Sequence, residues 1–341
     1  MSLFVSKKVL TVENVEVARI ACALPKDKYT LIEYAPNLFD EKRAKRMARG
    51  TGFTKLRIAP KEMTTSDLCK AAAEQLLEDI DKDTVKGLVF VSQTPDYTSP
   101  ATCHVLQYQL GLGHDIFCMD VSEGCSGWVR GVYVAGLICQ NSQAPVLLLA
   151  GDTLSKHTSP DDSATRGIFG DAGVATLLMP GKHSIPFLFQ SYGEQKDAIK
   201  LANYFQLRQK SHREGLGSLF SYIDGGAIMD FALAEVLEAI EEYLATITVS
   251  KEDIGLCACH QANKLILNNL ADKLGIPRTK VPFTAGEIGN ESSASIPLVL
   301  SSVSGEMDLS SSLCVGFGVG MSVGLAYCDF SNTRFYPTLE L

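Results

Sequence analysis

Short apolar segments rich in β-branched residues recur along the chain. They lack the alternation of polar and apolar positions that a half-exposed strand shows, so they predict strands buried on both faces of a sheet. The segments cover residues 87–91, 145–150, 174–178, 313–317 and 322–327.

Apolar residues at helical spacing fill the intervals between these segments. The periodicity predicts helices over residues 65–80, 126–140, 230–247 and 261–274. The first opens with threonine and serine capping candidates, and the last ends at Gly275 with Pro277 just beyond it. Strands that alternate with helices favour an α/β architecture with layered sheets.

The least regular segment covers residues 181–226, which hold charges and scattered glycines. We expect it to connect two halves, residues 1–180 and 181–341, and to supply loops that cover a substrate. In the first half a strand leads to Cys125 and then a helix, and in the second a strand leads to His260 and then a helix. This similarity indicates two related halves that face a shared site.

Composition narrows the functional classes. The 341 residues carry a formal net charge of -8, which argues against wholesale binding to nucleic acid or anionic lipid. No apolar run is long enough for a membrane span, and the N-terminus lacks the apolar core of a signal peptide, so we expect a cytoplasmic protein. The ten cysteines are then expected to be free thiols, and without any CxxC pair no metal site is expected.

Cys125 is the candidate nucleophile. An apolar stretch over 116–119 leads into a corner of small residues, and the predicted helix at 126–140 follows. Unpaired N–H groups and the dipole at a helix N-terminus favour a thiolate, which attacks thioester or amide carbonyls. The same N–H groups can hold the resulting oxyanion, and Gly124 and Gly127 allow a bulky substrate to approach.

Three further features are ambiguous when taken singly. His260 ends a buried-strand pattern, where a structural, hydrogen-bonded histidine is as reasonable as a functional one. Asn290 follows Gly289 in a tight turn and alone fits a turn or cap residue better than a catalytic one. The glycine-rich corner over 316–320 is typical of any turn between two strands.

Taken together and in order, these motifs resemble the condensing enzymes of the thiolase superfamily, and most closely β-ketoacyl-acyl-carrier-protein synthase III. The resemblance covers nearly the whole chain. The matching stretches are 94–102, 124–127, 166–173, 260–263, 289–292 and 317–320.

The resemblance implies a thiolase-like α/β fold of two similar halves stacked as five layers (αβαβα), and a homodimer paired through the first half. It implies a catalytic set of Cys125, His260 and Asn290, with Asn290 separating synthase III from relatives that use a second histidine, a second cysteine or a glutamate. It also implies an oxyanion hole made by the backbone N–H groups of Cys125 and Val319, where relatives often carry glycine.

The implied reaction has two steps and needs no cofactor or metal. An acyl group passes from acyl-CoA or an acyl-acyl carrier protein to Cys125. Malonyl-acyl carrier protein then loses CO₂, and His260 and Asn290 donate hydrogen bonds to the enolate oxygen while its carbon attacks the acyl group. The product is a β-ketoacyl thioester.

The chain departs from the family where substrate carriers bind. Arg46 stands approximately where many relatives have a tryptophan that stacks on the adenine of CoA, within the basic run 42–49. That run fits either a solvated helix face or a patch for phosphates or an acidic carrier protein. Asn263 is expected to bind the phosphopantetheine amides, and Arg166 is a candidate phosphate contact.

Two other positions differ from the relatives. Ser99 or Thr98 takes the place of a bulky residue that limits the primer pocket in some of them, which suggests a roomier pocket here. Glu123, two residues before the nucleophile, is expected at the surface or in the dimer interface rather than at the site.

Other functions fit parts of the same pattern. A specialised synthase III-like acyltransferase or condensing enzyme of secondary metabolism would share Cys125 and His260 and differ in its acceptor. A papain-like cysteine protease also orders Cys, His and Asn along the chain, but its signature around the cysteine is missing. A non-catalytic subunit of a heterodimeric synthase would not need all three residues.

Overall fold

The structure is a computed structural model, and it describes residues 9–201 and 220–341. The α-helices are α1 (Leu31–Tyr34), α2 (Glu41–Thr51), α3 (Thr65–Leu77), α4 (Thr102–Leu110), α5 (Gly127–Ser142), α6 (Ser163–Arg166), α7 (Gly225–Phe231), α8 (Leu237–Ile247), α9 (Lys264–Leu274) and α10 (Ser295–Val303). The strands are β1 (Leu10–Leu24), β2 (Lys28–Thr30), β3 (Lys55–Arg57), β4 (Gly87–Val91), β5 (Phe117–Val121), β6 (Val146–Asp152), β7 (Ala172–Ser191), β8 (Ile199–Lys200), β9 (Tyr222–Ile223), β10 (Leu256–Cys259), β11 (Ser312–Gly318), β12 (Ser322–Cys328), β13 (Arg334–Phe335) and β14 (Leu339–Glu340).

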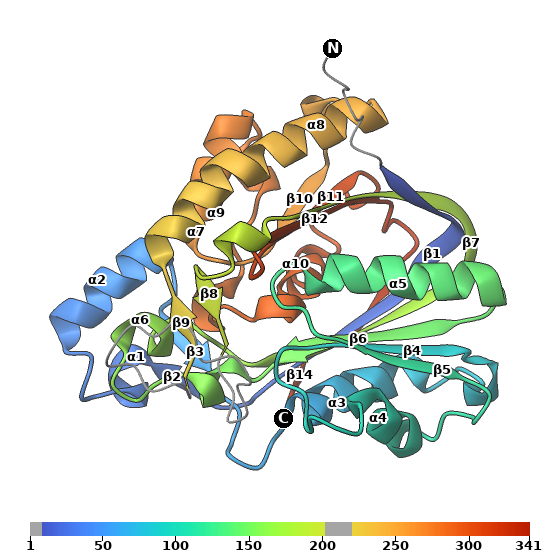
Figure 1. The fold of residues 1–341 in the computed structure, drawn as a ribbon, viewed down its shortest axis with the longest axis horizontal. Helices are drawn as coiled ribbons and strands as arrows, with labels where there is room; N and C mark the ends of the chain where they lie inside the picture. Colours follow the sequence, from blue (N-terminus) through green and yellow to red (C-terminus); the bar gives the residue numbers. More distant parts are fainter. Residues whose placement is uncertain (1–8, 202–219) are drawn as a thin grey trace.

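The elements stack in five layers. Helices α5 and α10 lie in the middle, between strands β10–β12 on one side and β4–β6 on the other (Figure 1). Helices α8 and α9 cover the outer face of β10–β12, while α3 and α4 cover the outer face of β4–β6. Three apolar cores fill the spaces between these layers. The α/β thiolase-like fold with αβαβα layers is therefore confirmed.

Both strand layers belong to one mixed, hydrogen-bonded sheet, in the order β10-β11-β12-β7-β6-β4-β5. The long strand β7 connects them. Its first part pairs with β6 over Ala172–Leu178, and its last part pairs with β12 over Phe187–Ser191. The predicted boundary between residues 180 and 181 therefore falls inside a continuous strand, and the two halves share it.

The predicted elements are present, with local shifts. All five predicted strands form, as β4, β6, β7, β11 and β12. Helix α3 begins at Thr65 as predicted, because Thr64 and Asp67 form a reciprocal capping box. Helix α9 begins at Lys264, three residues later than expected, because the Asn263 side chain caps it. The helix expected from residue 230 begins at Gly225 and contains a π-helical turn over Ala232–Val236.

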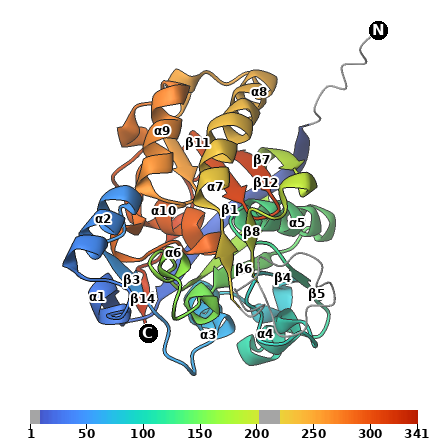
Figure 2. The ribbon, with the colours of Figure 1, turned by 60° about the vertical axis from the view of Figure 1, so that its left-hand side comes forward.

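The irregular segment lies beside the cavity described below. Strands β8 and β9 pair antiparallel, and β9 packs against α6. Residues 202–219, where part of the substrate-covering loops was expected, lie outside the described residues. Figure 2 shows β8 near α6 and α7, with α2 beside α9.

Three expectations from composition can be compared with the described residues. All ten cysteines are free, as predicted. Among the described residues, no helix is long and apolar enough to cross a bilayer, and no group of three or more His, Cys, Asp or Glu side chains could hold a metal ion.

Candidate active site

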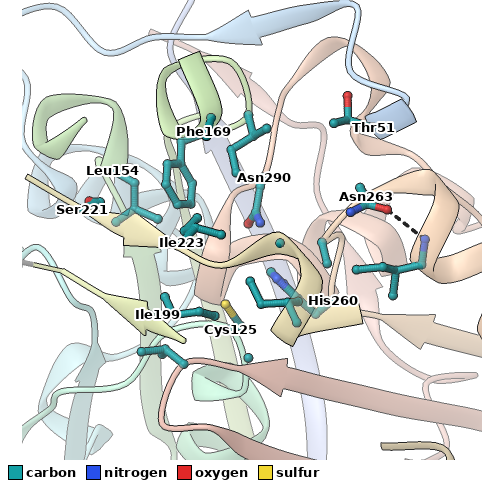
Figure 3. Close-up of a pocket in the computed structure, with 18 of the residues that line it drawn as sticks. Thr51, Cys125, Leu154, Phe169, Ile199, Ser221, Ile223, His260, Asn263 and Asn290 are labelled. Carbon is teal, nitrogen blue, oxygen red and sulfur yellow. Dashed lines mark hydrogen bonds between the residues drawn. The ribbon is translucent and has the colours of Figure 1, made fainter. Parts of the chain in front are cut away.

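Cys125, His260 and Asn290 line one cavity of about 270 Å³. They come from three separate corners of the chain: the turn before α5, the end of β10 and the turn before α10. Figure 3 shows their side chains around a common space. The structure thus brings together the three residues that the motifs single out.

Cys125 follows β5 and precedes α5, as predicted, and is one of two cysteines that are not fully buried, with Cys118. Burial of the sulfur nevertheless raises the pKa of the Cys125 thiol to about 11. The N–H groups of Val319 and of Cys125 itself act in the opposite direction, but less strongly. The expectation of a thiolate is therefore wrong for this structure, because desolvation outweighs the N–H groups at the helix end.

The backbone around Val319 closes on the sulfur. A Cβ placed on Gly318 would lie 2.7 Å from both Cβ and Sγ of Cys125, so only glycine fits there. Val319 is not among the described non-glycine residues with positive φ, so the β-branched side chain needs no unusual backbone. The backbone N–H groups of Val319 and Cys125 both interact with the Cys125 sulfur.

His260 is 2% exposed and is held by contacts on two sides. Its backbone N–H donates to the carbonyl of Val315 at 2.8 Å, and its ring meets Phe317 edge-on with centroids 5.7 Å apart. Ring atom Nδ1 lies 3.0 Å from Oγ of Ser295. Burial lowers the pKa of His260 to about 3, and a contact with the Ser292 backbone offsets this only in part, so the imidazole is neutral.

Asn290 is fixed through both its backbone and its side chain. Its N–H donates to the carbonyl of Ile168 at 2.7 Å, and its own carbonyl accepts from the N–H of Gly170 at 3.1 Å. Side-chain Oδ1 accepts from the N–H of Ser292 at 3.0 Å. Since the amide oxygen is engaged in this way, the NH₂ group is the part of the amide that is left for the cavity.

The three residues predicted to bind the substrate carriers occupy different positions relative to the cavity. Asn263 lines the cavity, and its Oδ1 accepts from the N–H of Ile266 at 2.8 Å as the cap of α9 (Figure 3). The Arg166 guanidinium is not among the groups lining the cavity, because it stacks 4.2 Å above the Tyr34 ring and donates to the Thr158 hydroxyl. Arg46 is exposed on α2, next to a cavity-lining methionine.

Two further residues at the site, Ser295 and Gln93, were not identified from the sequence. Ser295 contacts the His260 ring, and Gln93 lines the cavity with its Oε1 3.3 Å from the Ser292 hydroxyl. The mostly polar run over 290–295, directly before the apolar stretch Ile296–Leu300, was the available signal for Ser295. Glu123 is half-buried beside Arg130 and does not line the cavity.

Apolar side chains make most of the remaining wall. They come from both halves of the chain and from the β8–β9 hairpin. They include Leu154, Phe169, Ile199, Ile223 and Ile228. Such a wall suits a hydrocarbon group placed next to the Cys125 sulfur.

Comparisons with known proteins agree with this geometry. The family model for 3-oxoacyl-[acyl-carrier-protein (ACP)] synthase III matches residues 119–193, and the model for its C-terminal part matches residues 244–330. The β-ketoacyl-[acyl-carrier-protein] synthase III of Streptococcus agalactiae serotype III is 33% identical over 283 residues, covering 80% of this chain and 87% of that protein. The enzyme of the same name from Latilactobacillus sakei is 31% identical over 332 residues, covering 91% and 98%.

A solved structure is similar over the full length. The 3-oxoacyl-(acyl-carrier protein) synthase from Burkholderia xenovorans LB400 superimposes with a TM-score of 0.92 at 29% identity, covering 99% of this chain and 100% of that one. The chain belongs to the β-ketoacyl-acyl-carrier-protein synthase III family of thiolase-superfamily condensing enzymes, and it is an acyltransferase.

Proposed function

We propose that the protein joins an acyl thioester primer to malonyl-acyl carrier protein by decarboxylative Claisen condensation, with acyl-Cys125 as the intermediate. The observation that carries the proposal is the convergence of a thiol, a neutral imidazole and a carboxamide on one mostly apolar cavity. Each of the two half-reactions uses a different part of this set.

Acyl transfer to Cys125 comes first. Because the thiol is neutral, its proton must leave as the sulfur attacks the primer carbonyl, and the neutral His260 ring is the base that lines the same cavity. The N–H groups of Cys125 and Val319 then stabilise the tetrahedral oxyanion. The carrier thiol departs and the acyl group stays on the sulfur.

Condensation follows when a malonyl thioester enters. Loss of CO₂ leaves an enolate, and His260 and Asn290 donate hydrogen bonds to its oxygen. Two uncharged donors stabilise this charge without protonating the carbanion. The carbanion attacks the acyl carbon, Cys125 departs as the leaving group, and the β-ketoacyl thioester forms.

The apolar wall supports an acyl chain as the primer. Leu154, Phe169 and Ile223 offer it only dispersion contacts and desolvation. A primer that carries a charge at its far end would leave that charge unpaired here, which the cavity disfavours. We therefore propose uncharged acyl primers as substrates.

Mass spectrometry of the intact protein tests the intermediate. After incubation with a panel of acyl-CoA and acyl-carrier thioesters, the wild-type protein gains one acyl group, and Cys125→Ala gains none. Cys118→Ala is the matched control, because Cys118 is the other cysteine that is not fully buried. A label that Cys125→Ala keeps and Cys118→Ala loses would refute the assignment.

Asn290→Ala separates the two half-reactions. We expect it to acylate Cys125 normally and to lose decarboxylation of the malonyl thioester by about 10²–10³-fold, as when one oxyanion donor is removed. Release of ¹⁴CO₂ from labelled malonyl thioester measures this step. A variant that decarboxylates at the wild-type rate would show that the amide has another role.

Amine and hydroxyl acceptors, assayed in parallel with malonyl-acyl carrier protein, test the alternative that the protein is a specialised acyltransferase.

We also propose that α2 receives the carrier protein. Met47 and Thr51 of this helix line the cavity, and five exposed basic residues cover its outer surface: Lys42, Arg43, Lys45, Arg46 and Arg49. Arg46→Glu is expected to lower kcat/KM for malonyl-acyl carrier protein about fivefold at low salt. It should leave a small malonyl thioester of N-acetylcysteamine unaffected, as should Lys182→Glu, a charge reversal on a separate exposed lysine. Equal losses with both substrates would exclude docking.

The protein is further proposed to be a homodimer paired through β5. This strand ends the sheet, and its outer edge has no partner strand among the described residues. Phe117 and Met119 on it are 53% and 40% exposed. An apolar edge of this kind is normally covered.

A further inference from the structure

Glu291 is a buried carboxyl group directly beside the candidate catalytic set. It follows Asn290, is 1% exposed, and makes no ion pair with any described residue. Desolvating a carboxyl group without a cationic partner is costly, so its surroundings need a physical account. The reaction described above does not use it.

Ser295 connects Glu291 to His260. Its Oγ lies 3.3 Å from Oε2 of Glu291 and 3.0 Å from Nδ1 of His260. The same oxygen lies 2.8 Å from the backbone carbonyl of Ser292. A serine hydroxyl has one proton and two lone pairs, so its three neighbours compete for one donor.

We propose that Glu291 is a positioning residue for His260, and that its protonation, passed on through the Ser295 hydroxyl, decides which ring nitrogen of His260 carries the proton. The geometry defines two arrangements. When Glu291 is a carboxylate, Ser295 donates to it or to the Ser292 carbonyl, so Ser295 must accept from Nδ1–H, and Nε2 carries no proton. When Glu291 is a neutral acid, it can donate to Ser295, which can then donate to Nδ1, and the ring proton is on Nε2.

These arrangements differ in what they allow in the cavity. Nδ1 is engaged with Ser295, so Nε2 is the nitrogen left for substrate. A bare Nε2 accepts the Cys125 proton during acyl transfer, and an Nε2–H donates to the enolate during condensation. This consequence rests on the proposed function, whereas the link between Glu291 and the tautomer does not.

The proton balance closes over the two half-reactions. A proton that enters Nε2 from Cys125 sends the Nδ1 proton to Ser295 and the Ser295 proton to the Glu291 carboxylate, while the departing carrier thiolate takes a proton from solvent. After condensation the Cys125 thiolate recovers a proton from Nε2, and the transfers reverse. One solvent proton is therefore consumed for each CO₂ released.

The other titratable groups near Glu291 stay neutral around physiological pH. Burial raises the pKa of Cys22 on β1, which senses the Glu291 charge, to about 12, and lowers the pKa of His260 to about 3. The same effect raises the pKa of Glu291 to about 8, against its hydrogen bonds to its own backbone and to Ser295. Glu291 is thus the group of this cluster that changes charge between pH 7 and pH 10.

Glu291→Gln tests the proposal, because its amide can always donate to Ser295 and cannot titrate. Malonyl decarboxylation by acylated wild-type protein should fall about tenfold per pH unit above pH 8, since the carboxylate removes the Nε2–H donor. In Glu291→Gln this loss should be absent up to pH 10. An unchanged alkaline loss in the variant would overturn the proposal.

Ser295→Ala should cut decarboxylation about 10²-fold at pH 7 and should also slow acylation, because it breaks the link that carries the proton between His260 and Glu291. Ser302→Ala is the matched control, since Ser302 lies on the same helix and also donates to the carbonyl three residues earlier. A Ser295→Ala variant with wild-type decarboxylation would also count against the proposal.

NMR of ¹⁵N-histidine-labelled full-length protein gives a readout that needs no activity. The His260 signals, assigned by their loss in His260→Asn, should report Nε2–H at pH 7 and Nδ1–H at pH 9.5 in the wild type. The same tautomer at both pH values would overturn the proposal, even if malonyl thioesters proved not to be substrates. A tautomer change without malonyl decarboxylation would refute the proposed function alone.

Discussion

Gly318 is the glycine where the chain leaves least room beside the Cys125 side chain. It has φ near +151°, and an added Cβ would lie 2.7 Å from Cys125 Sγ. Real Cβ atoms do not approach so closely, and both contacting atoms belong to Cys125, so the cysteine must move if a side chain is added. Because attack geometry tolerates little displacement, the substitution acts on chemistry before stability.

Gly318→Ala is therefore expected to slow acylation of Cys125 by about 10²-fold while the protein stays folded, as measured by intact mass against time and by circular dichroism. Gly305→Ala is the control: it has φ near +86° but no atom within 4 Å, so it carries the backbone strain without the clash. Equal loss of acylation in both variants would mean that strain, and not contact with Cys125, is responsible.

Which residues meet at the cavity could be predicted from the sequence, because Cys125, His260 and Asn290 each occupy a local corner with its own motif. Their ionisation could not. The sequence shows the helix that follows Cys125, which favours a thiolate, but the pKa depends on how much water the whole fold removes from the sulfur. The contact of Ser295 with His260 could not be predicted either, because it depends on the packing of α10 against β10.

Asn263 both caps helix α9 and lines the cavity. Asn263 caps the helix with Oδ1, and its residue also lines the cavity, where Nδ2 is available for a pantetheine amide. We propose that this NH₂ group binds the carrier, so stability and binding would depend on different atoms of the Asn263 side chain. Substitutions that keep one atom type and remove the other can separate the two effects.

Asn263→Ala should lower the free energy of unfolding by about 1 kcal/mol through loss of the cap. Asn263→Asp keeps an acceptor at a helix N-terminus and should stay within about 0.5 kcal/mol of the wild type. Both remove the NH₂ donor and should raise KM for thioester substrates about fivefold, which corresponds to one hydrogen bond. Urea unfolding and steady-state kinetics measure the two effects, and a wild-type KM in Asn263→Asp would exclude the binding role.

The ends of helices were predictable from the sequence where capping residues next to the helix define them. The start of α3 and the glycine end of α9 follow from capping residues that act within a few positions. Strands β8 and β9 were not predicted, because two-residue strands carry no periodic pattern and form only by pairing with each other. The stacking of Arg166 on Tyr34 could not be predicted for a similar reason, because it joins segments far apart in the chain.

On the scale of the whole molecule, the layered fold was predictable because the motifs occur in family order along nearly the full chain. The continuous path of β7 through both strand layers was not, since residues 180–186 carry prolines and polar residues that are typical of a connection. The sheet that results ends at β5, and this edge sets the expected assembly.

The edge at β5 has the features of an interface and few of those that protect a free edge. Its five residues include no lysine or proline, and the apolar Phe117 and Met119 are exposed. Tyr97 and Tyr108, in the loop before α4 and on α4, add exposed aromatic surface at 56% and 83% in the part of the chain that precedes β5. A second copy that pairs its own β5 across a two-fold axis would satisfy the free backbone groups and cover these side chains.

Phe117→Asp should therefore convert a dimer of about twice 36.9 kDa into a monomer, because a carboxylate on each copy would face its symmetry mate across the axis. Sedimentation velocity at micromolar concentration measures the change. Leu265→Asp is the matched control, an equally exposed apolar residue (49%) on α9, which lies on the opposite outer layer of the fold (Figure 1). If Phe117→Asp remains dimeric, or if the wild-type protein sediments as a monomer, pairing through β5 is excluded, and the exposed apolar edge must meet some other surface.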